Sequence, residues 1–228
     1  MSGEKRYADW IAVDWGTSNV RAWAMRNGEA IGENASDQGM GSLTPDAFEP
    51  ALLNLIDPWL GAEPMTVIAC GMVGARQGWI EAPYLKVPCP PVGGKTTRPD
   101  TVDPRLDVHI LPGLSQEKPA DVMRGEETQI AGFLAEKPDF DGILCLPGTH
   151  TKWVQISAGE VVSFRTFMTG EMYALFATQS VLRHSMDNGW DEAAYSEAVR
   201  DGMANPQTLA GRFFSLRAES LLGTPSPG

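Results

Sequence analysis

Apolar residues along the chain gather in short runs that end at glycine-containing turns, a pattern typical of β-strands. Residues 10–14 and 20–25 are two such runs, joined by the turn at 15–19. Asn27-Gly28 then predicts a tight hairpin turn into a third strand at 30–34. The same pattern predicts further strands at residues 65–70, 108–111, 142–146, 152–157 and 161–166.

Apolar residues at helical spacing mark a second kind of element. Thr44 and Pro45 suit the cap and first position of a helix over residues 46–60. The proline-rich residues 81–105 are expected to be irregular, and residues 115–120 to form a hinge or linker. Further helices are predicted at residues 126–136, 170–185, 191–203 and 207–222.

Strands and helices share the chain, so the predicted fold class is α/β. The chain has 228 residues, which is long enough for more than one domain. The expected linker divides it into an N-terminal lobe, residues 1–115, and a second lobe, residues 116–228.

The net charge of −11 argues against nucleic acid or a membrane as the main partner, because both carry negative charge. No apolar run reaches the roughly 18 residues that span a bilayer, and the polar N-terminus lacks a signal-peptide core. Cys70, Cys89 and Cys145 are too scattered for a disulfide framework or a zinc site. We therefore expect a soluble, cytoplasmic protein that binds small molecules.

Two glycine turns between apolar strands contain hydroxyl residues suited to phosphate. In the first, Asp14 ends a strand and is followed by Gly16, Thr17 and Ser18. Gly16 lets backbone N–H groups approach a ligand, the hydroxyls add donors, and Asp14 is placed to hold Mg²⁺ beside the phosphates. An ordinary polar hairpin turn is the alternative interpretation.

The second turn repeats this chemistry with Gly148, Thr149 and Thr151. One such turn is weak evidence of phosphate binding. Two turns in one chain are stronger evidence, because together they allow a nucleotide phosphate tail to be held from two sides.

Glu126 and Glu127 begin the helix predicted at 126–136. Adjacent helical side chains point about 100° apart, so only one of the two carboxylates needs to face a cleft. Carboxylates near a helix N-terminus are also favourable for electrostatic reasons alone. Phosphoryl transfer to a hydroxyl needs a base within hydrogen-bond reach of the acceptor, and either glutamate can supply it.

The glycine-rich stretch 71–84 has the composition of a loop that recognises a polyhydroxylated acid. In it, Arg76 can clamp a carboxylate through two parallel hydrogen bonds. A plain surface loop whose tryptophan covers the core is the alternative. The candidate substrate contacts are Gly74, Arg76, Gln77, Trp79 and Tyr84.

Longer strings within these segments carry a resemblance to a known family. Residues 11–18 (IAVDWGTS), 123–129 (MRGEETQ), 146–154 (LPGTHTKWV) and 166–172 (TFMTGEM) resemble the 2-dehydro-3-deoxygalactonokinase family. That family belongs to the actin/hexokinase/Hsp70-like superfamily of sugar kinases. The resemblance covers essentially the whole chain and implies an actin-like (ribonuclease H-like), two-lobed ATPase fold with mixed sheets and helices.

The resemblance implies that ATP, with Mg²⁺, phosphorylates 2-dehydro-3-deoxy-D-galactonate at its 6-hydroxyl in galactonate catabolism. Glu126 matches the position where related carbohydrate kinases have the aspartate base of a Gly-Asp pair, and Glu127 is the second choice. The segment 74–79 corresponds to their sugar-contacting loop. The residues that match the two phosphate motifs are Asp14, Gly16, Thr17 and Ser18, and then Gly148, Thr149 and Thr151.

Family members continue past the last residues of this chain, into further helices and a glycine motif that holds adenosine. We therefore expect the second lobe to be incomplete at its C-terminus, which predicts exposed apolar surface or assembly into a homo-oligomer. One alternative is a truncated, non-catalytic protein that binds a sugar acid or a nucleotide. Another is a kinase that acts on a related sugar acid.

Overall fold

The computed structural model describes residues 8–186 and 189–223. The sequence predictions for the N-terminal residues 1–7 and for the tail 224–228 lie outside the described residues. The chain divides into two units. Unit 1 comprises the chain up to Leu146 together with Lys152–Thr166, and unit 2 comprises Pro147–Thr151 and the chain from Phe167 onward. Each unit is described by itself.

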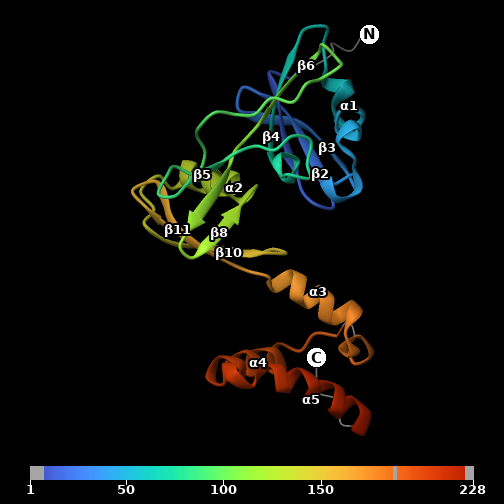
Figure 1. Ribbon diagram of the computed structural model, residues 1–228, viewed down its shortest axis with the longest axis vertical. Coiled ribbons are helices and arrows are strands. Elements are labelled where there is room, and N and C mark those ends of the chain that lie inside the picture. The colour runs from blue at the N-terminus through green and yellow to red at the C-terminus, as the bar shows by residue number, and fades with distance from the viewer. Residues whose placement is uncertain (1–7, 187–188, 224–228) are drawn as a thin grey trace. The chain divides into compact units, whose positions relative to one another are not determined.

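A five-stranded mixed sheet forms the first half of unit 1 (Figure 1). Its strand order is β3-β2-β1-β4-β6, with β1 antiparallel to β2 and parallel to β4. This sheet is the one expected of the ribonuclease H-like fold. Its strands are β1 (Trp10–Trp15), β2 (Val20–Arg26), β3 (Glu29–Ser36), β4 (Met65–Gly71) and β6 (Leu106–Ile110).

The hairpin turn between β2 and β3 confirms the prediction from Asn27-Gly28. Both residues have positive φ angles, 51° and 82°, which is the backbone of the expected type I′ turn. The predicted helix is shorter than expected, because Pro45–Ala47 and Asp57–Trp59 are 3₁₀ turns on either side of α1 (Phe48–Ile56).

The first hydrophobic core lies between this sheet and α1. It contains Trp15, Phe48 and Ile110, none of which exposes any surface. All of its buried members come from residues 8–110. The second core draws on later residues, among them Leu114, Ile130 and Val154.

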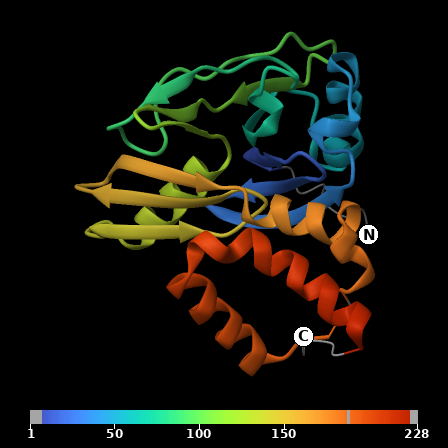
Figure 2. The same cartoon turned by 60° about the horizontal axis from the view of Figure 1, so that its bottom comes forward.

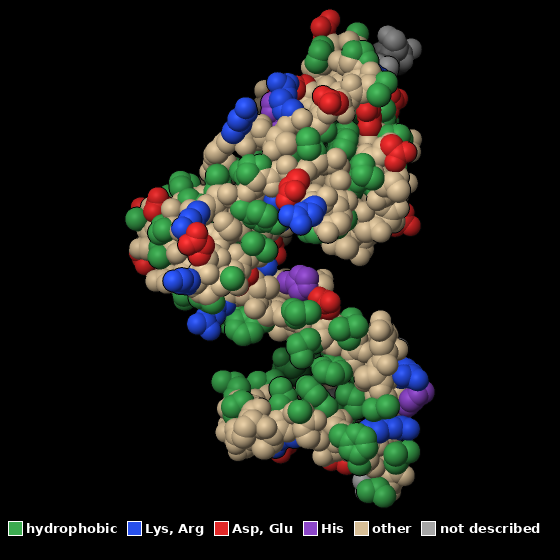
Figure 3. All heavy atoms as spheres, in the orientation of Figure 1, with side chains coloured by type: hydrophobic (Ala, Val, Ile, Leu, Met, Phe, Trp, Pro, Cys, Tyr) green, Lys and Arg blue, Asp and Glu red, His purple; other side chains and the backbone are tan. Residues whose placement is uncertain are grey.

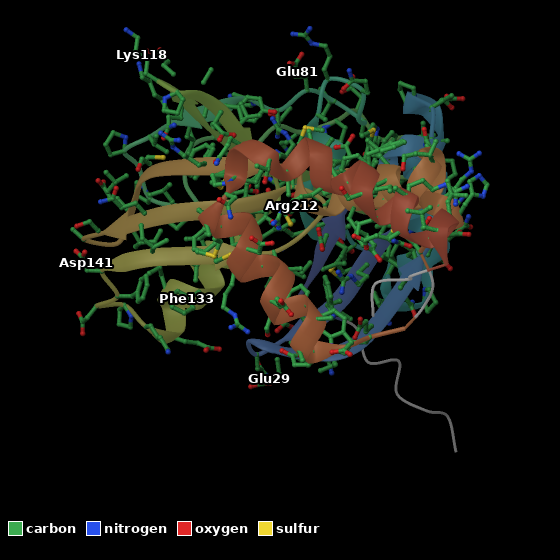
Figure 4. All side chains as sticks on the ribbon, turned by 90° about the horizontal axis from the view of Figure 1, so that it is seen from below. Glu29, Glu81, Lys118, Phe133, Asp141 and Arg212 are labelled. Carbon is green, nitrogen blue, oxygen red and sulfur yellow. The ribbon has the colours of Figure 1, made fainter. Side chains whose placement is uncertain are left out.

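The predicted linker at 115–120 is wrong. Residues Gly113–Glu117 form strand β7, which pairs antiparallel with β8 (Ala120–Met123) and parallel with β5 (Tyr84–Lys86). Lys118, at the turn between β7 and β8, points outward in Figure 4. The polar composition of this segment is not typical of a buried strand. Gln116 is nevertheless buried in β7, because its amide group forms hydrogen bonds with the backbone of Pro119 and Phe164.

A third sheet, of three strands, and one helix complete unit 1. The sheet contains β9 (Gly142–Leu146), β10 (Thr151–Ser157) and β11 (Glu160–Phe167) in the order β11-β10-β9. Helix α2 spans Glu126–Glu136, as the sequence predicts. The side chains of Ile130 and Leu134, on its buried face, belong to the second core.

Unit 2 consists mainly of helices (Figure 2, orange to red). They are α3 (Thr169–Gln179), the 3₁₀ turn Val181–His184, α4 (Glu192–Ala204), the 3₁₀ turn Pro206–Thr208 and α5 (Leu209–Leu222). None of the side chains of α3, α4 or α5 is fully buried. Apolar side chains gather on the surface of this unit in Figure 3. Trp190, Met203 and Phe214 are among its exposed apolar residues, so the predicted apolar exposure is present.

The fold class is therefore the predicted α/β class with mixed sheets and helices. The division at residue 115 stays a prediction, although the two hydrophobic cores separate near that point. Within the described residues, none of the helices is both long and apolar enough to cross a bilayer.

Candidate active site

The first glycine turn is held by backbone contacts to a second segment of unit 1. The N–H of Gly16 donates to Asn19 across the turn at 2.8 Å. The segment at 39–41 then braces it, because the N–H of Met40 donates to Gly16 and that of Gly41 to Thr17, at 3.0 and 2.9 Å. The side chains of Thr17 and Ser18 remain exposed, which suits donors that contact a ligand.

Only glycine fits at position 39. A Cβ atom there would lie 2.3–2.5 Å from backbone atoms of Thr17, Ser18 and Asn19. Such distances are far below van der Waals contact, so the shape of the turn depends on this residue. The sequence analysis did not single out Gly39, since its partner lies about twenty residues away.

Asp14 meets two other parts of the site at the end of β1. The parallel pairing places Asp14 opposite Cys70 and Trp15 opposite Gly71. A Cβ on Gly71 would lie 3.5 Å from Asp14 Oδ1, and a Cβ on Gly125 would lie 3.3 Å from the Cα of Gly71. Both glycines have positive φ angles, 90° and 106°, which favour the absence of a side chain. The first phosphate motif therefore lies beside the start of α2.

A cavity of about 280 Å³ opens between these elements. Its polar lining includes Asp14, Cys70, Gly125, Thr128 and Gln129. Burial and the nearby charge of Asp14 raise the pKa of the Cys70 thiol to about 12. The thiol therefore stays protonated at neutral pH and does not act as a nucleophile.

The two candidate bases on α2 have different surroundings. Glu127 is 1% exposed, and its Oε2 accepts a 2.7 Å hydrogen bond from the N–H of Gly125. It lies on the helix face of Ile130 and Leu134, three and seven positions further along. Burial raises the pKa of Glu127 to about 7.

Glu126 points away from that face, and its side chain is 23% exposed. Its Oε2 accepts a 3.1 Å hydrogen bond from the N–H of Arg124. Its Oε1 lies 3.9 Å from Lys152 Nζ. Glu126 is therefore both accessible from solvent and held in a defined orientation, whereas Glu127 is not accessible.

Lys152 is a buried cation that the sequence analysis did not identify as functional. It is 5% exposed, and its Nζ donates to the carbonyl of Val122 and to Thr166 Oγ1 at 3.0 and 2.8 Å. The Thr166 hydroxyl donates in turn to Asp121 Oδ1 at 2.7 Å. This network holds the ammonium group beside Glu126. In the sequence, Lys152 looks like any surface lysine. Its burial depends on partners that are distant along the chain.

The predicted sugar-acid loop has one exposed side and one side that packs on the protein. Arg76 and Gln77 are exposed, and Arg76 Nε lies 3.7 Å from Glu81 Oε1. Trp79 packs instead against Trp15 and Phe48 of the first core, with ring centroids 6.4 and 6.1 Å away. The packing of Trp79 is therefore that of the alternative interpretation, in which this tryptophan covers the core.

Gly74 and Tyr84 both lie against Arg124, the residue that precedes Gly125. The Arg124 guanidinium lies 4.3 Å from the centroid of the Tyr84 ring. A Cβ on Gly74 would approach Arg124 Nη1 to 2.8 Å. The loop is therefore connected to the start of α2, which carries both candidate bases, through one arginine.

The second glycine turn belongs to unit 2, where it lies against the start of α3. The N–H of Glu171 donates to Thr149 at 3.1 Å, and the Thr151 and Thr169 hydroxyls share a hydrogen bond. The N–H of Gly148 contacts Thr151 Oγ1 at 3.3 Å, and the loop at 147–150 is exposed. These contacts give the turn a defined shape of its own.

Comparison with known proteins adds independent information. A family model described as 2-keto-3-deoxy-galactonokinase matches residues 14–228. A Rhizobium meliloti protein named as a probable 2-dehydro-3-deoxygalactonokinase is 37% identical over 222 residues, which cover 93% of this chain and 72% of that protein. The Escherichia coli protein named 2-dehydro-3-deoxygalactonokinase is 34% identical over 222 residues, which cover 95% of this chain and 73% of its own length.

A solved structure agrees with these sequence matches. It is the crystal structure of a Sinorhizobium meliloti protein provisionally assigned as a 2-dehydro-3-deoxygalactonokinase, with 37% identity and a TM-score of 0.87. The match covers 94% of this chain and 73% of that one. The chain belongs to the 2-keto-3-deoxy-galactonokinase family.

Proposed function

We propose that this protein transfers the γ-phosphoryl group of ATP to the 6-hydroxyl of 2-dehydro-3-deoxy-D-galactonate. Its family membership supports this reaction, and so do the names of the relatives to which it is similar. The phosphate-binding roles belong to the two glycine turns, at Asp14–Ser18 in unit 1 and Gly148–Thr151 in unit 2. The exposed hydroxyls of Thr17, Ser18 and Thr149 are suited to phosphate oxygens. Thr151 is buried instead, and its hydroxyl bonds to Thr169, so its role is to shape the second turn.

Asp14 is the proposed ligand for Mg²⁺. The described residues contain no group of three or more metal-ligating side chains. Mg²⁺ at kinase sites uses one or two carboxylates together with substrate phosphates, so a single aspartate beside the phosphate turn fits. Bound there, Mg²⁺ neutralises phosphate charge. Arg21, 3.6 Å from Asp14, adds a positive charge to the same region.

Glu126 acts as the base in this proposal. Its Oε1 takes the proton from the 6-hydroxyl as the hydroxyl oxygen bonds to the γ-phosphorus. The bond from that phosphorus to the β,γ-bridging oxygen breaks at the same centre, and ADP leaves with the electron pair. The partly exposed side chain and its 3.1 Å hydrogen bond from Arg124 support this role over Glu127.

Lys152 positions Glu126 rather than contacting substrate. Its 3.9 Å approach to Oε1 is favourable only while the glutamate is ionised, which is the form that accepts a proton. The hydrogen bond to Thr166 keeps the ammonium in place. Lys152→Met is expected to lower kcat more than it changes KM for the sugar acid.

The contrast between Glu126 and Glu127 is the observation that supports the mechanism. The experiment measures ADP release with MgATP, with and without the sugar acid, for the wild type, Glu126→Gln and Glu127→Gln. We expect sugar-acid-dependent ADP from the wild type. Glu126→Gln should lose about 10³-fold in kcat, as for removal of a general base, whereas Glu127→Gln stays within about 10-fold.

Other outcomes have definite meanings. A reversed ranking of the two variants would move the base to Glu127. Wild-type binding of the sugar acid without ADP release would contradict the kinase proposal. ADP release that depends on a different sugar acid would keep the reaction and change its substrate.

A cytoplasmic location and a homo-oligomeric state stay predictions. The cysteines of the described residues are free, which suits a reducing compartment. The exposed apolar side chains of unit 2 support self-association. Light scattering of the purified protein tests the second prediction.

A further inference from the structure

We infer that Arg124 binds the carboxylate of the sugar acid and thereby selects acids over neutral sugars. The inference rests on the proposed function and concerns the same site. It assigns the carboxylate to a residue different from Arg76, the arginine that the sequence pattern favours.

The Arg124 guanidinium has unused hydrogen-bond donors. Its Nη2 donates to the carbonyl of Ala82 at 2.8 Å. Its Nε and Nη1 are buried, and neither has a hydrogen-bond acceptor among the described residues. Buried donors of a charged group are rarely left without acceptors, because their desolvation is not compensated. Nη2 carries a second N–H besides the one given to Ala82, and together with Nε or with Nη1 it forms a parallel pair of donors that matches the two oxygens of a carboxylate.

The surroundings of Arg124 are suited to admitting a ligand. The Tyr84 ring covers the guanidinium with its centroid 4.3 Å away, and Tyr84 is itself 39% exposed. The ring covers one face of the guanidinium, and the inference requires it to move aside when the acid binds. Gly74 lies on Nη1 so closely that a side chain there would collide with it. Both residues belong to the loop predicted to contact substrate.

Arg124 is also placed to serve both ends of the substrate, one through its side chain and the other through its backbone. Its backbone N–H holds Glu126 Oε2 at 3.1 Å, while its side chain extends to the sugar-acid loop. The sugar acid has its carboxylate at one end and the reacting hydroxyl at the other. One residue can thus hold the carboxylate through its side chain and orient the base through its backbone.

Arg76 has a weaker claim to the carboxylate. Its side chain is 80% exposed, and its nearest partner is Glu81 at 3.7 Å. Exposed pairs of this kind are held loosely and are screened by salt. A buried guanidinium has fewer water molecules to give up and fewer orientations, so it discriminates more sharply.

The test compares the sugar acid with its primary amide, which has the same shape and lacks the charge. The wild type should have a kcat/KM about 30-fold to 100-fold higher for the acid, the range for losing charge-assisted hydrogen bonds. Arg124→Met should lose that preference through KM, and Arg124→Lys should recover only part of it. Arg98→Met, at an exposed arginine paired with Asp107 outside the site, is the matched control.

Several results would overturn the inference. If the wild-type enzyme uses the acid and the amide equally well, the inference is wrong. This result needs no variant, so it holds even if Arg124→Met fails to fold. An acid-specific loss in Arg76→Met but not in Arg124→Lys would return the carboxylate to Arg76. A rise in KM for ATP alone would mean that Arg124 serves phosphate. A last result is that Arg124→Met loses kcat/KM equally for the acid and the amide, and that Glu127→Gln reproduces the loss. This result would mean that the Arg124 guanidinium only pairs with the Glu127 carboxylate.

Failure of the proposed function gives a different result. If the wild type releases no ADP with the sugar acid, calorimetric titration still compares binding of the acid and the amide to the wild type and to Arg124→Lys. An acid preference that the variant weakens would uphold the role of Arg124 without the kinase reaction. No preference in the wild type would overturn it.

Discussion

The two glycine turns contain similar residues but are supported by different parts of the protein. The first turn is fastened by backbone hydrogen bonds to the segment at 39–41, beside a core whose side chains are fully buried. The second turn lies against α3, in a unit whose α-helices contain no fully buried side chain. The comparison teaches that turns of similar sequence can have unequal support from the structure around them. Substitutions at the first turn should affect the whole of unit 1, and those at the second should stay local.

The largest effect is expected from Gly39→Ala. Its Cβ would lie 2.3–2.5 Å from backbone atoms of the first turn, so the turn and the segment at 39–41 must separate. We expect about 3 kcal/mol of lost unfolding free energy, the upper range for overpacking, and a raised KM for ATP. Urea denaturation measures the unfolding free energy, and ADP release at several ATP concentrations measures KM for ATP.

Gly41→Ala is the control for this prediction. The Cβ atom at that position would come no closer than 3.2 Å, to Thr17 O. It should therefore cost much less than Gly39→Ala. Equal losses in both variants would contradict the view that steric fit at position 39 shapes the turn.

An effect of similar size, but dependent on pH, concerns the buried Glu127. Its pKa rises from 4.5 to about 7 because burial disfavours the charged form, so the folded state favours the protonated carboxyl. The unfolding free energy contributed by this group therefore falls as the pH rises from about 4.5 to 7. Glu127→Gln removes this dependence and should be more stable than the wild type by about 3 kcal/mol at pH 8, with little difference at pH 4.

Urea denaturation at several pH values checks this prediction. Glu126→Gln, at the neighbouring and partly exposed position, is the matched control. A Glu127→Gln variant with the wild-type slope would show that another group causes the dependence.

A smaller and local effect is expected from Gly170→Ala in unit 2. Its Cβ would lie 2.7 Å from Gly148 O and 2.9 Å from the Cα of Thr149, so the second turn must shift away from α3. We expect a local cost of about 1–2 kcal/mol. Hydrogen exchange should become faster at 148–151 and 170–173, while the sheet of unit 1 is unchanged.

Gly202→Ala, in α4, is the matched substitution for this experiment. Nothing lies within 4 Å of a Cβ at that position. Removing a helical glycine should therefore stabilise α4 by about 0.5–1 kcal/mol. Faster exchange throughout unit 1 in Gly170→Ala would break the proposed contrast between the two turns.

The smallest effect should come from His150→Ala. Its imidazole pairs with Glu171, but both side chains are more than one-third exposed. Such pairs contribute less than about 1 kcal/mol, and salt reduces the contribution further. The thermal midpoint should change by no more than about 4 °C. A larger change would show that side chains, rather than the backbone around Gly148, hold the second turn.

The sequence predicted most elements of the fold because their signals are local. Asn27-Gly28 specifies its own turn, and residues 126–136 begin and end as the periodicity indicates. The error at 115–120 has a different cause. Gln116 is acceptable in a buried strand only because Phe164, 48 positions away, satisfies its amide.

The same distinction between local and distant information applies to the candidate site. The motifs at Asp14–Ser18 and Gly148–Thr151 are continuous strings, so they can be read directly. Burial of Glu127 was also readable, since Ile130 and Leu134 follow it on one helix face. Lys152 and Arg124 were missed because their environments come from several strands that meet only in the fold.

The approach of Gly125 to Gly71 has a mechanical consequence. With no side chain on either residue, the start of α2 and the end of β4 are in direct backbone contact. No rotamer change can absorb a displacement between them. A displacement of the start of α2, which carries the proposed base, is therefore expected to be transmitted to the end of β4 and to the loop that follows it.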